Sequence, residues 1–245
     1  MNNKTLVEIL KHYQWDCDKD PNCGNKIFPG HTYLEVYDRL FAPFQNKQIN
    51  VLEIGILRGI SLKLWSEYFS KANIFGYDTF ERTSWQGCSY EEVQEFLKYY
   101  DRITLTKVNS CSTDSEELRI RTELLNSIPD GFFDIIIDDG SHELNDQVDT
   151  YNNFKSKLSK TGIYIVEDIG IANDNVFDPQ EFIDRVPEFK LLDMRYPEKH
   201  DNAIAIFYND NTPYTAHYQT YFDSKHWLTA PEFHTDYIYR KQYEY

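Results

Sequence analysis

Short apolar runs alternate with amphipathic segments along most of the chain. The run at 132–137 is apolar throughout except at Asp134. A strand that is apolar on both faces is typical of a parallel sheet covered by helices on both sides. In the segments between the runs, apolar residues recur every three or four positions, beginning with Leu6, Ile9 and Leu10. This spacing predicts helices that each bury one face.

These patterns predict a regular order of strands and helices. We predict strands at 49–54, 74–77, 103–108, 132–137 and 163–166, and a final strand pair at 190–194 and 203–208. We predict helices at 6–13, 32–41, 60–69, 91–100, 116–128, 145–158 and 181–186, and a tight turn at 161–162. Strands alternating with helices favour an α/β fold with a Rossmann-like, doubly wound and mostly parallel sheet.

We expect a single domain, because no break in composition divides the chain. It comprises a helical extension at 1–45, the Rossmann-like core at 46–208 and a C-terminal tail at 209–245. The tail is rich in tyrosine, phenylalanine and tryptophan. Aromatic residues are enriched at protein interfaces. The tail therefore favours a homo-oligomer, with wrapping over its own domain as the alternative.

Polar residues end the central predicted strand abruptly. Asp138, Asp139, Gly140, Ser141 and His142 follow the apolar run directly. Ligands bind at the carboxyl ends of strands in open α/β sheets. Adjacent carboxylates repel each other there and require a cation, a donor or a proton. The alternative is a solvated loop in which Ser141 caps the next helix.

Two further strand ends carry acidic residues. Glu167 and Asp168 follow the predicted strand at 163–166. Glu53 lies in the first strand, and Asp78 stands at the end of the second. A carboxylate about 20 residues after a first βα turn can accept both ribose hydroxyls of a nucleoside. The turn itself is glycine-rich at 55–59 but does not have the GxGxxG spacing of dinucleotide-binding proteins.

Composition excludes several classes of function. The formal net charge is −15 and the sequence pI is about 4.8. Such an acidic chain is not expected to bind the phosphate backbone of nucleic acid. No apolar run approaches the length of a membrane span, and no signal peptide is evident. Four cysteines without paired metal-binding spacing suggest reduced thiols and a cytoplasmic location.

Four motifs together resemble one enzyme family. They are His31-Thr32-Tyr33, Leu52-Glu53-Ile54-Gly55-Ile56, Ile137-Asp138-Asp139-Gly140-Ser141-His142 and Gly162-Ile163-Tyr164-Ile165-Val166-Glu167-Asp168. In this order, over roughly residues 30–170, they resemble class I S-adenosylmethionine-dependent methyltransferases. The resemblance narrows to the metal-dependent sugar O-methyltransferases of macrolide tailoring, of the mycinamicin type.

The resemblance implies two cofactors and a set of site residues. S-adenosylmethionine would contact Tyr33, Glu53, Gly55, Gly59, Asp78, Ser110 and Asp138. Alternatively, Tyr33 only packs in the hydrophobic core and does not contact the cofactor. Mg²⁺ would be held by Asp139, Glu167 and Asp168, and His142 would act as catalytic base beside Asp139. Two departures, Ile60 after Gly59 and Asn109-Ser110-Cys111 where the family has Gly-Asp-Gln, leave the adenine contacts unassigned.

The expected function is O-methylation of a sugar or glycosylated small molecule. The acceptor would be a sugar, a nucleotide-sugar or a glycan. One alternative is an inactive protein that binds S-adenosylmethionine or a metal for interaction alone. A second is a nucleotide- or NAD-linked enzyme, which the absent GxGxxG disfavours. A third is a related oxygenase, which would need two histidines and a carboxylate around iron, whereas the acidic motifs contain only His142.

Overall fold

The computed structural model describes residues 4–15, 17, 19, 31–81, 88–172, 175–176, 178–195 and 202–209. Its main sheet has seven strands in the order β3-β2-β1-β4-β5-β9-β8, and β6 and β7 form a separate pair. The strands are β1 (Asn50–Ile54), β2 (Asn73–Asp78), β3 (Ile103–Lys107), β4 (Phe133–Asp138), β5 (Leu158–Val166), β6 (Ile171–Ala172), β7 (Asn175–Val176), β8 (Lys190–Asp193) and β9 (Ala203–Tyr208). The first five strands are parallel, whereas β9 runs antiparallel to β5 and β8 antiparallel to β9. The predicted Rossmann-like sheet is confirmed.

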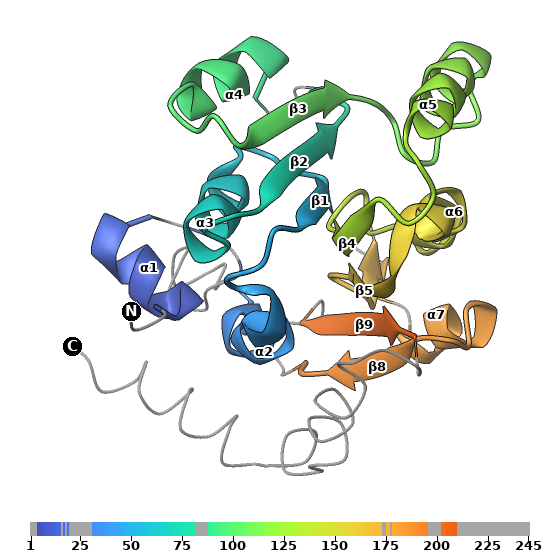
Figure 1. Ribbon diagram of the computed structural model, residues 1–245. Helices are drawn as coiled ribbons and strands as arrows, with labels where there is room; N and C mark the ends of the chain where they lie inside the picture. The colour runs from blue at the N-terminus through green and yellow to red at the C-terminus, as the bar shows by residue number, and fades with distance from the viewer. Residues whose placement is uncertain are drawn as a thin grey trace.

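Helices cover both faces of this sheet (Figure 1). They are α1 (Leu6–Tyr13), α2 (Tyr33–Phe41), α3 (Ile60–Tyr68), α4 (Tyr90–Leu97), α5 (Ser115–Ser127), α6 (Leu144–Phe154) and α7 (Gln180–Arg185), with 3-10 helices at Ala42–Phe44 and Lys155–Lys157. Side chains of successive strand residues point to opposite faces. Val51 and Ile135 therefore join the core under α1 to α4, while Leu52 and Ile136 join the core under α6 and α7. The strand order reverses between β1 and β4, which is where open α/β sheets bind ligands.

The predicted turn at 161–162 is wrong, because β5 runs through it. The helix expected to reach residue 158 ends at Phe154, and β5 begins at Leu158. A Cβ atom on Gly162 would lie 2.8 Å from the carbonyl oxygen of Asp134. Glycine at this position thus allows β5 to approach β4 closely, at the point where the pairing of the two strands changes register.

Gly55 joins two loops of the candidate site. It has a φ of +81°, and a Cβ atom there would lie only 2.0 Å from the carbonyl oxygen of Asp139. An L-residue is disfavoured at this φ, and no side-chain movement can relieve a clash with backbone. Glycine is therefore required here for the loop after β1 to lie against the loop after β4.

Two further sequence expectations concern the C-terminal tail and membrane spans. The tail beyond residue 209, and with it the evidence for a homo-oligomer, lies outside the described part of the chain. None of the described helices combines the length and the hydropathy that crossing a membrane requires.

Candidate functional site

The candidate site lies where the carboxyl ends of β1, β4 and β5 meet. Backbone hydrogen bonds extend the strand pairing into the loops, since Asp139 N–H donates to the Ile54 carbonyl at 2.8 Å. Glu167 N–H likewise donates to the Asp138 carbonyl at 2.9 Å. The side-chain amide of Gln147, on α6, donates to the Glu167 carbonyl at 3.0 Å. The acidic motif residues are thus held on backbone that the sheet itself orders.

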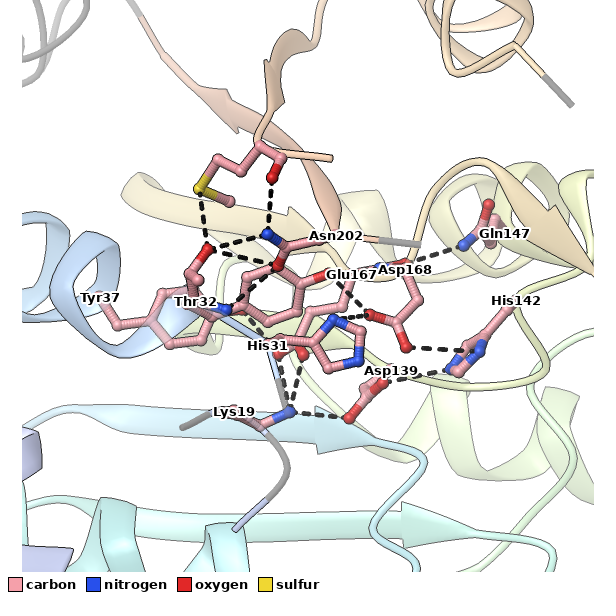
Figure 2. Close-up of polar contacts among 12 residues, drawn as sticks. Lys19, His31, Thr32, Tyr37, Asp139, His142, Gln147, Glu167, Asp168 and Asn202 are labelled. Atoms are coloured by element: carbon pink, nitrogen blue, oxygen red, sulfur yellow. Dashed lines mark hydrogen bonds and ion pairs between the residues drawn. The ribbon is translucent and has the colours of Figure 1, made fainter. Parts of the chain in front are cut away.

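A buried lysine lies in the inner half of the site (Figure 2). Lys19 Nζ donates to Asp139 Oδ2 at 2.7 Å and to both carboxylate oxygens of Glu167 at 2.8 Å. It also lies 3.3 Å from Glu53 Oε1. The Tyr37 hydroxyl, from α2, donates to Glu167 Oε1 at 2.6 Å. A single ammonium group thus contacts three carboxylates.

The outer half of the site is formed by Asp168 and two histidines. Asp168 Oδ1 accepts from the Tyr33 hydroxyl at 2.7 Å and lies 3.2 Å from His31 Nδ1. Asp168 Oδ2 lies 3.6 Å from His142 Nδ1. His142 Nε2 lies 3.2 Å from Asp139 Oδ1. The ring of His142 therefore lies between two carboxylates, with one nitrogen facing each (Figure 2).

The backbone is strained at two of these positions. His142 has a φ of +63° and Asp168 a φ of +54°. Residues other than glycine rarely adopt this region, and those that do are concentrated at active sites and ligand clamps. The strain places both side chains toward Asp139, which supports a functional role for the pair.

Burial and charge determine the protonation of the acidic cluster, which comprises Glu53, Asp139, Glu167 and Asp168 together with Lys19 and His142. Burial alone would lower the pKa of His142, but Asp168 and Asp139 outweigh it and raise this pKa to about 10. Burial opposes ionisation of Asp139 as well, yet Lys19 and His142 hold its pKa well below the usual range. Burial and the negative charge of Asp139 raise the pKa of Glu167 well above its ordinary value. In this arrangement His142 is an imidazolium and Asp139 a carboxylate near pH 7.

The cofactor-binding residues predicted at the glycine turn are brought together. Asp78 Oδ2 accepts from the backbone N–H groups of Ile56 at 2.8 Å and Leu57 at 3.3 Å, and Oδ1 accepts from Phe80 N–H at 2.7 Å. The carboxylate thereby fixes the turn after β1, and Gly59, with a φ of +78°, leads into α3. Its predicted role toward a ribose remains a prediction.

Glu53 is turned into the protein, where its side chain is fully buried. Its Oε2 accepts from the Ser61 hydroxyl at 2.7 Å and from Trp65 Nε1 at 3.1 Å. Its Oε1 faces Lys19, and burial raises the pKa of this carboxyl to about 7. The structure therefore joins Glu53 to the acidic cluster.

The other residues predicted from the sequence lie either at the candidate site or in the surrounding packing. Burial raises the pKa of Asp138 to about 8, and its Oδ2 has no hydrogen-bond partner among the described residues. Ser110 pairs with the Thr150 hydroxyl at 2.8 Å, between the loop after β3 and α6. Tyr33 is a fully buried residue, as its alternative reading expected, and also contacts Asp168. Ser141 does not cap α6 at the N-cap position, which is Glu143; its Oγ accepts from Glu143 N–H at 3.3 Å instead.

Sequence reasoning missed Lys19, Tyr37 and Asn202. The side-chain amide of Asn202, just before β9, accepts from Thr32 N–H at 3.1 Å and donates to the Thr32 hydroxyl at 2.9 Å. It also donates to the Met194 carbonyl at 2.7 Å. These bonds fix the start of α2 beside the cluster (Figure 2). All three residues stand outside the acidic motifs. The spacing of Tyr37 in the predicted helix at 32–41 indicates core packing, which its full burial confirms, but not its contact with Glu167. No spacing marks Lys19 or Asn202.

Among the described residues, two overlapping groups of side chains could hold a metal ion. One comprises Asp139, His142 and Asp168, and the other Glu53, Asp139 and Glu167. Asp139 belongs to both, and the predicted set of Asp139, Glu167 and Asp168 spans them. The carboxylate oxygens are hard donors that suit Mg²⁺, and the ammonium of Lys19 shows that the cluster accepts a cation. The residues present therefore fit the expected metal.

Comparisons with known proteins confirm the resemblance to sugar O-methyltransferases. A tetracenomycin-C rhamnosyl 2'-O-methyltransferase of Streptomyces olivaceus is 28% identical over 146 residues, covering 57% of this chain and 33% of the relative. Mycinamicin VI 2''-O-methyltransferase of Micromonospora griseorubida is 30% identical over 164 residues, covering 62% of this chain and 36% of the relative. The matched region thus spans about a third of the length of these curated relatives. No protein-family model matches the chain.

Solved structures support the fold. The MycE methyltransferase of the mycinamycin biosynthetic pathway, in complex with Mg, SAH and mycinamycin VI, aligns with a TM-score of 0.54 at 22% identity. The alignment covers 84% of this chain and 55% of that protein. The described sheet is therefore that of class I methyltransferases.

Proposed function

We propose that this chain is an S-adenosylmethionine- and Mg²⁺-dependent O-methyltransferase acting on a hydroxyl of a sugar or glycosylated small molecule. The observation that carries the proposal is the acidic cluster of Asp139, Glu167 and Asp168, placed beside the glycine turn on this fold. The named functions of the curated relatives, which methylate hydroxyls of glycosylated polyketides, support the acceptor class.

Each group would contribute a separate part of the reaction. When bound, S-adenosylmethionine supplies the methyl group, and Mg²⁺ makes a hydroxyl bound to it more acidic. Asp139 and Asp168 orient His142 from its two ring nitrogens. His142 would receive the acceptor proton at one of these nitrogens, which requires one of the two carboxylate contacts to be replaced. The carboxylates also offset the charge of a cationic methyl donor.

The described residues do not form the triad that the oxygenase alternative needs. His31 and His142 both face Asp168, but they do so on different oxygens, and His31 belongs to neither candidate metal group. Of the two candidate metal groups found among the described residues, one contains a single histidine and the other none. A non-haem iron triad needs two histidines and one carboxylate. Oxygen ligands thus predominate, which favours Mg²⁺.

A direct assay tests the proposed reaction. The chain is incubated with S-adenosylmethionine and a panel of nucleotide-sugars, oligosaccharides and glycosylated polyketides, with and without Mg²⁺. We expect acceptor products that are one methyl group heavier, detected by mass spectrometry only when Mg²⁺ is present. Equal yields after chelation would remove the metal from the proposal, and tight metal and cofactor binding without any product would favour an interaction protein.

Replacing Asp78 with Ala should weaken binding of S-adenosylhomocysteine. A carboxylate that accepts hydrogen bonds from two ribose hydroxyls contributes about 1.5–3 kcal/mol, equivalent to roughly a 10- to 150-fold loss of affinity. The affinity is measured by calorimetry. Since Asp78 also holds the backbone at Ile56, the control is Asp134→Asn, which lies at the other end of the sheet and accepts a backbone hydrogen bond from Asn50 at 3.1 Å. Unchanged affinity in Asp78→Ala would contradict the ribose assignment.

A further inference from the structure

Lys19 is an unusual lysine because only 1% of its surface is exposed. Lysine is almost never fully buried unless an opposite charge accompanies it. Here Asp139 and Glu167 lie within hydrogen-bond distance, and Glu53 follows at 3.3 Å. The ammonium group thus has the surroundings of a bound cation.

The oxygens that Lys19 contacts are those on which a metal would depend. Its Nζ engages both carboxylate oxygens of Glu167 and Oδ2 of Asp139. Glu53, Asp139 and Glu167 also form one of the two candidate metal groups. A divalent ion sharing these oxygens would lie only a few ångströms from the ammonium group. Two cations at that separation in a buried site repel each other strongly.

The carboxylates could not remain uncompensated if Lys19 were absent. Glu53 Oε1 is fully buried and has no hydrogen bond among the described residues, so the nearby ammonium group is the cation that the structure shows facing it. Buried carboxylates without a counter-charge are strongly destabilising. Glu53 and Glu167 therefore require the ammonium group as their counter-charge, and a second cation at the same oxygens would be repelled by it.

We infer that Lys19 is the resident cation of this cluster and that a divalent metal ion displaces its ammonium group from Asp139 and Glu167. The inference rests on the proposed function, since it concerns the same metal. It assigns Lys19 a role that the acidic motifs do not reveal: the lysine pairs with the carboxylates and holds them in place before the metal binds. It also makes the apparent metal affinity a balance between two cations.

Chemical labelling of the unaltered chain tests the displacement. The chain is treated briefly with an amine-acetylating reagent, with and without saturating Mg²⁺, and acetylation is measured for each lysine by peptide mass spectrometry. We expect Mg²⁺ to increase the acetylation rate of Lys19 by at least about tenfold, because a buried, ion-paired amine is protected. Lys98 is the control, since its side chain is 43% exposed and its partner is Glu95, away from the cluster. Its rate should not change.

A variant provides an independent measurement. Lys19→Met removes the charge and keeps most of the length of the side chain, so calorimetry should show at least about tenfold tighter Mg²⁺ binding than in the unaltered chain or in Lys98→Met. If Lys19→Met does not fold, the labelling of the unaltered chain decides alone. Unchanged Lys19 acetylation while Mg²⁺ binds, or no Mg²⁺ binding at all, would overturn the inference.

The two proposals fail in different ways. Mg²⁺-dependent methyl transfer with Lys19 still protected would refute only the displacement. Metal-dependent exposure of Lys19 in a chain that methylates no acceptor would refute only the proposed reaction.

Discussion

Asp139→Asn is expected to abolish methyl transfer while the chain stays folded and still binds S-adenosylhomocysteine. Asp139 is the residue shared by both candidate metal groups, and it contacts Lys19 and His142 as well. Asparagine keeps the shape of the side chain but removes its charge. A metal-bound acceptor contributes several kcal/mol to transition-state stabilisation, so turnover should fall by at least about 10³-fold. The readouts are Mg²⁺ binding by calorimetry and product by mass spectrometry.

The matched control for this variant is Asp134→Asn on the same strand. Asp134 lies at the opposite end of β4, where it accepts hydrogen bonds from Asn50 N–H and the Ser159 hydroxyl. It should retain full turnover. Cofactor binding should survive in Asp139→Asn because Asp78 is on a different strand. An active Asp139→Asn enzyme, or full activity of the unaltered chain after chelation, would rule out the metal mechanism and leave a base-assisted methyltransferase.

His142→Ala should lower turnover by about 10²–10⁴, the usual contribution of a general base, while Mg²⁺ and cofactor still bind. The pKa of His142 is raised to about 10, since Asp168 and Asp139 outweigh the effect of burial. Acting as a base therefore requires positive charge that offsets these two carboxylates. The measurement is kcat with a saturating acceptor, alongside calorimetry for both ligands.

Two further variants separate the base from a residue that only positions its neighbours. His142→Gln keeps a hydrogen-bonding side chain but cannot take up a proton at neutral pH, so it should be as impaired as His142→Ala. His12→Ala alters an exposed histidine on α1 and should leave turnover unchanged. Full activity of His142→Gln would show that the histidine acts through hydrogen bonding alone.

The sequence predicted the sheet and the acidic end of the site for one physical reason. Parallel strands carry their ligand-binding residues at a common edge, so Asp139 and Glu167 could be placed together from their positions after apolar runs. The positive φ at His142 and Asp168 could not be predicted from the sequence. Histidine and aspartate are enriched at positive φ, but most residues of either type do not adopt it, so the residue type alone does not mark the position. The prediction of a turn at 161–162 was wrong because Gly162 lies within β5, where the absence of a side chain allows close packing against β4.

Lys19 and Asn202 could not be predicted from pattern. Lys19 belongs to a polar, turn-rich segment, where a lysine ordinarily indicates solvent exposure. Its burial follows only from the carboxylates that the finished sheet assembles. Asn202 precedes an apolar strand, and its bonds to Thr32 span 170 positions of sequence. Contacts of this kind depend on tertiary packing and leave no local periodicity.

The bonds between Asn202 and Thr32 have a consequence for how this protein acquires its site. Residues 30–170 contain every recognisable motif, yet Asn202, which holds the start of α2, lies directly before β9, the last described element of the chain. Contacts between distant segments form late, since closing long loops costs entropy before any contact compensates for it. A nascent chain thus has its acidic motifs before it has the support for His31 and Tyr33. Assembly of the complete site is therefore coupled to synthesis of the segment that leads into β9. A fragment that stops at residue 170 contains the acidic side chains without the contacts from Asn202 that order the start of α2.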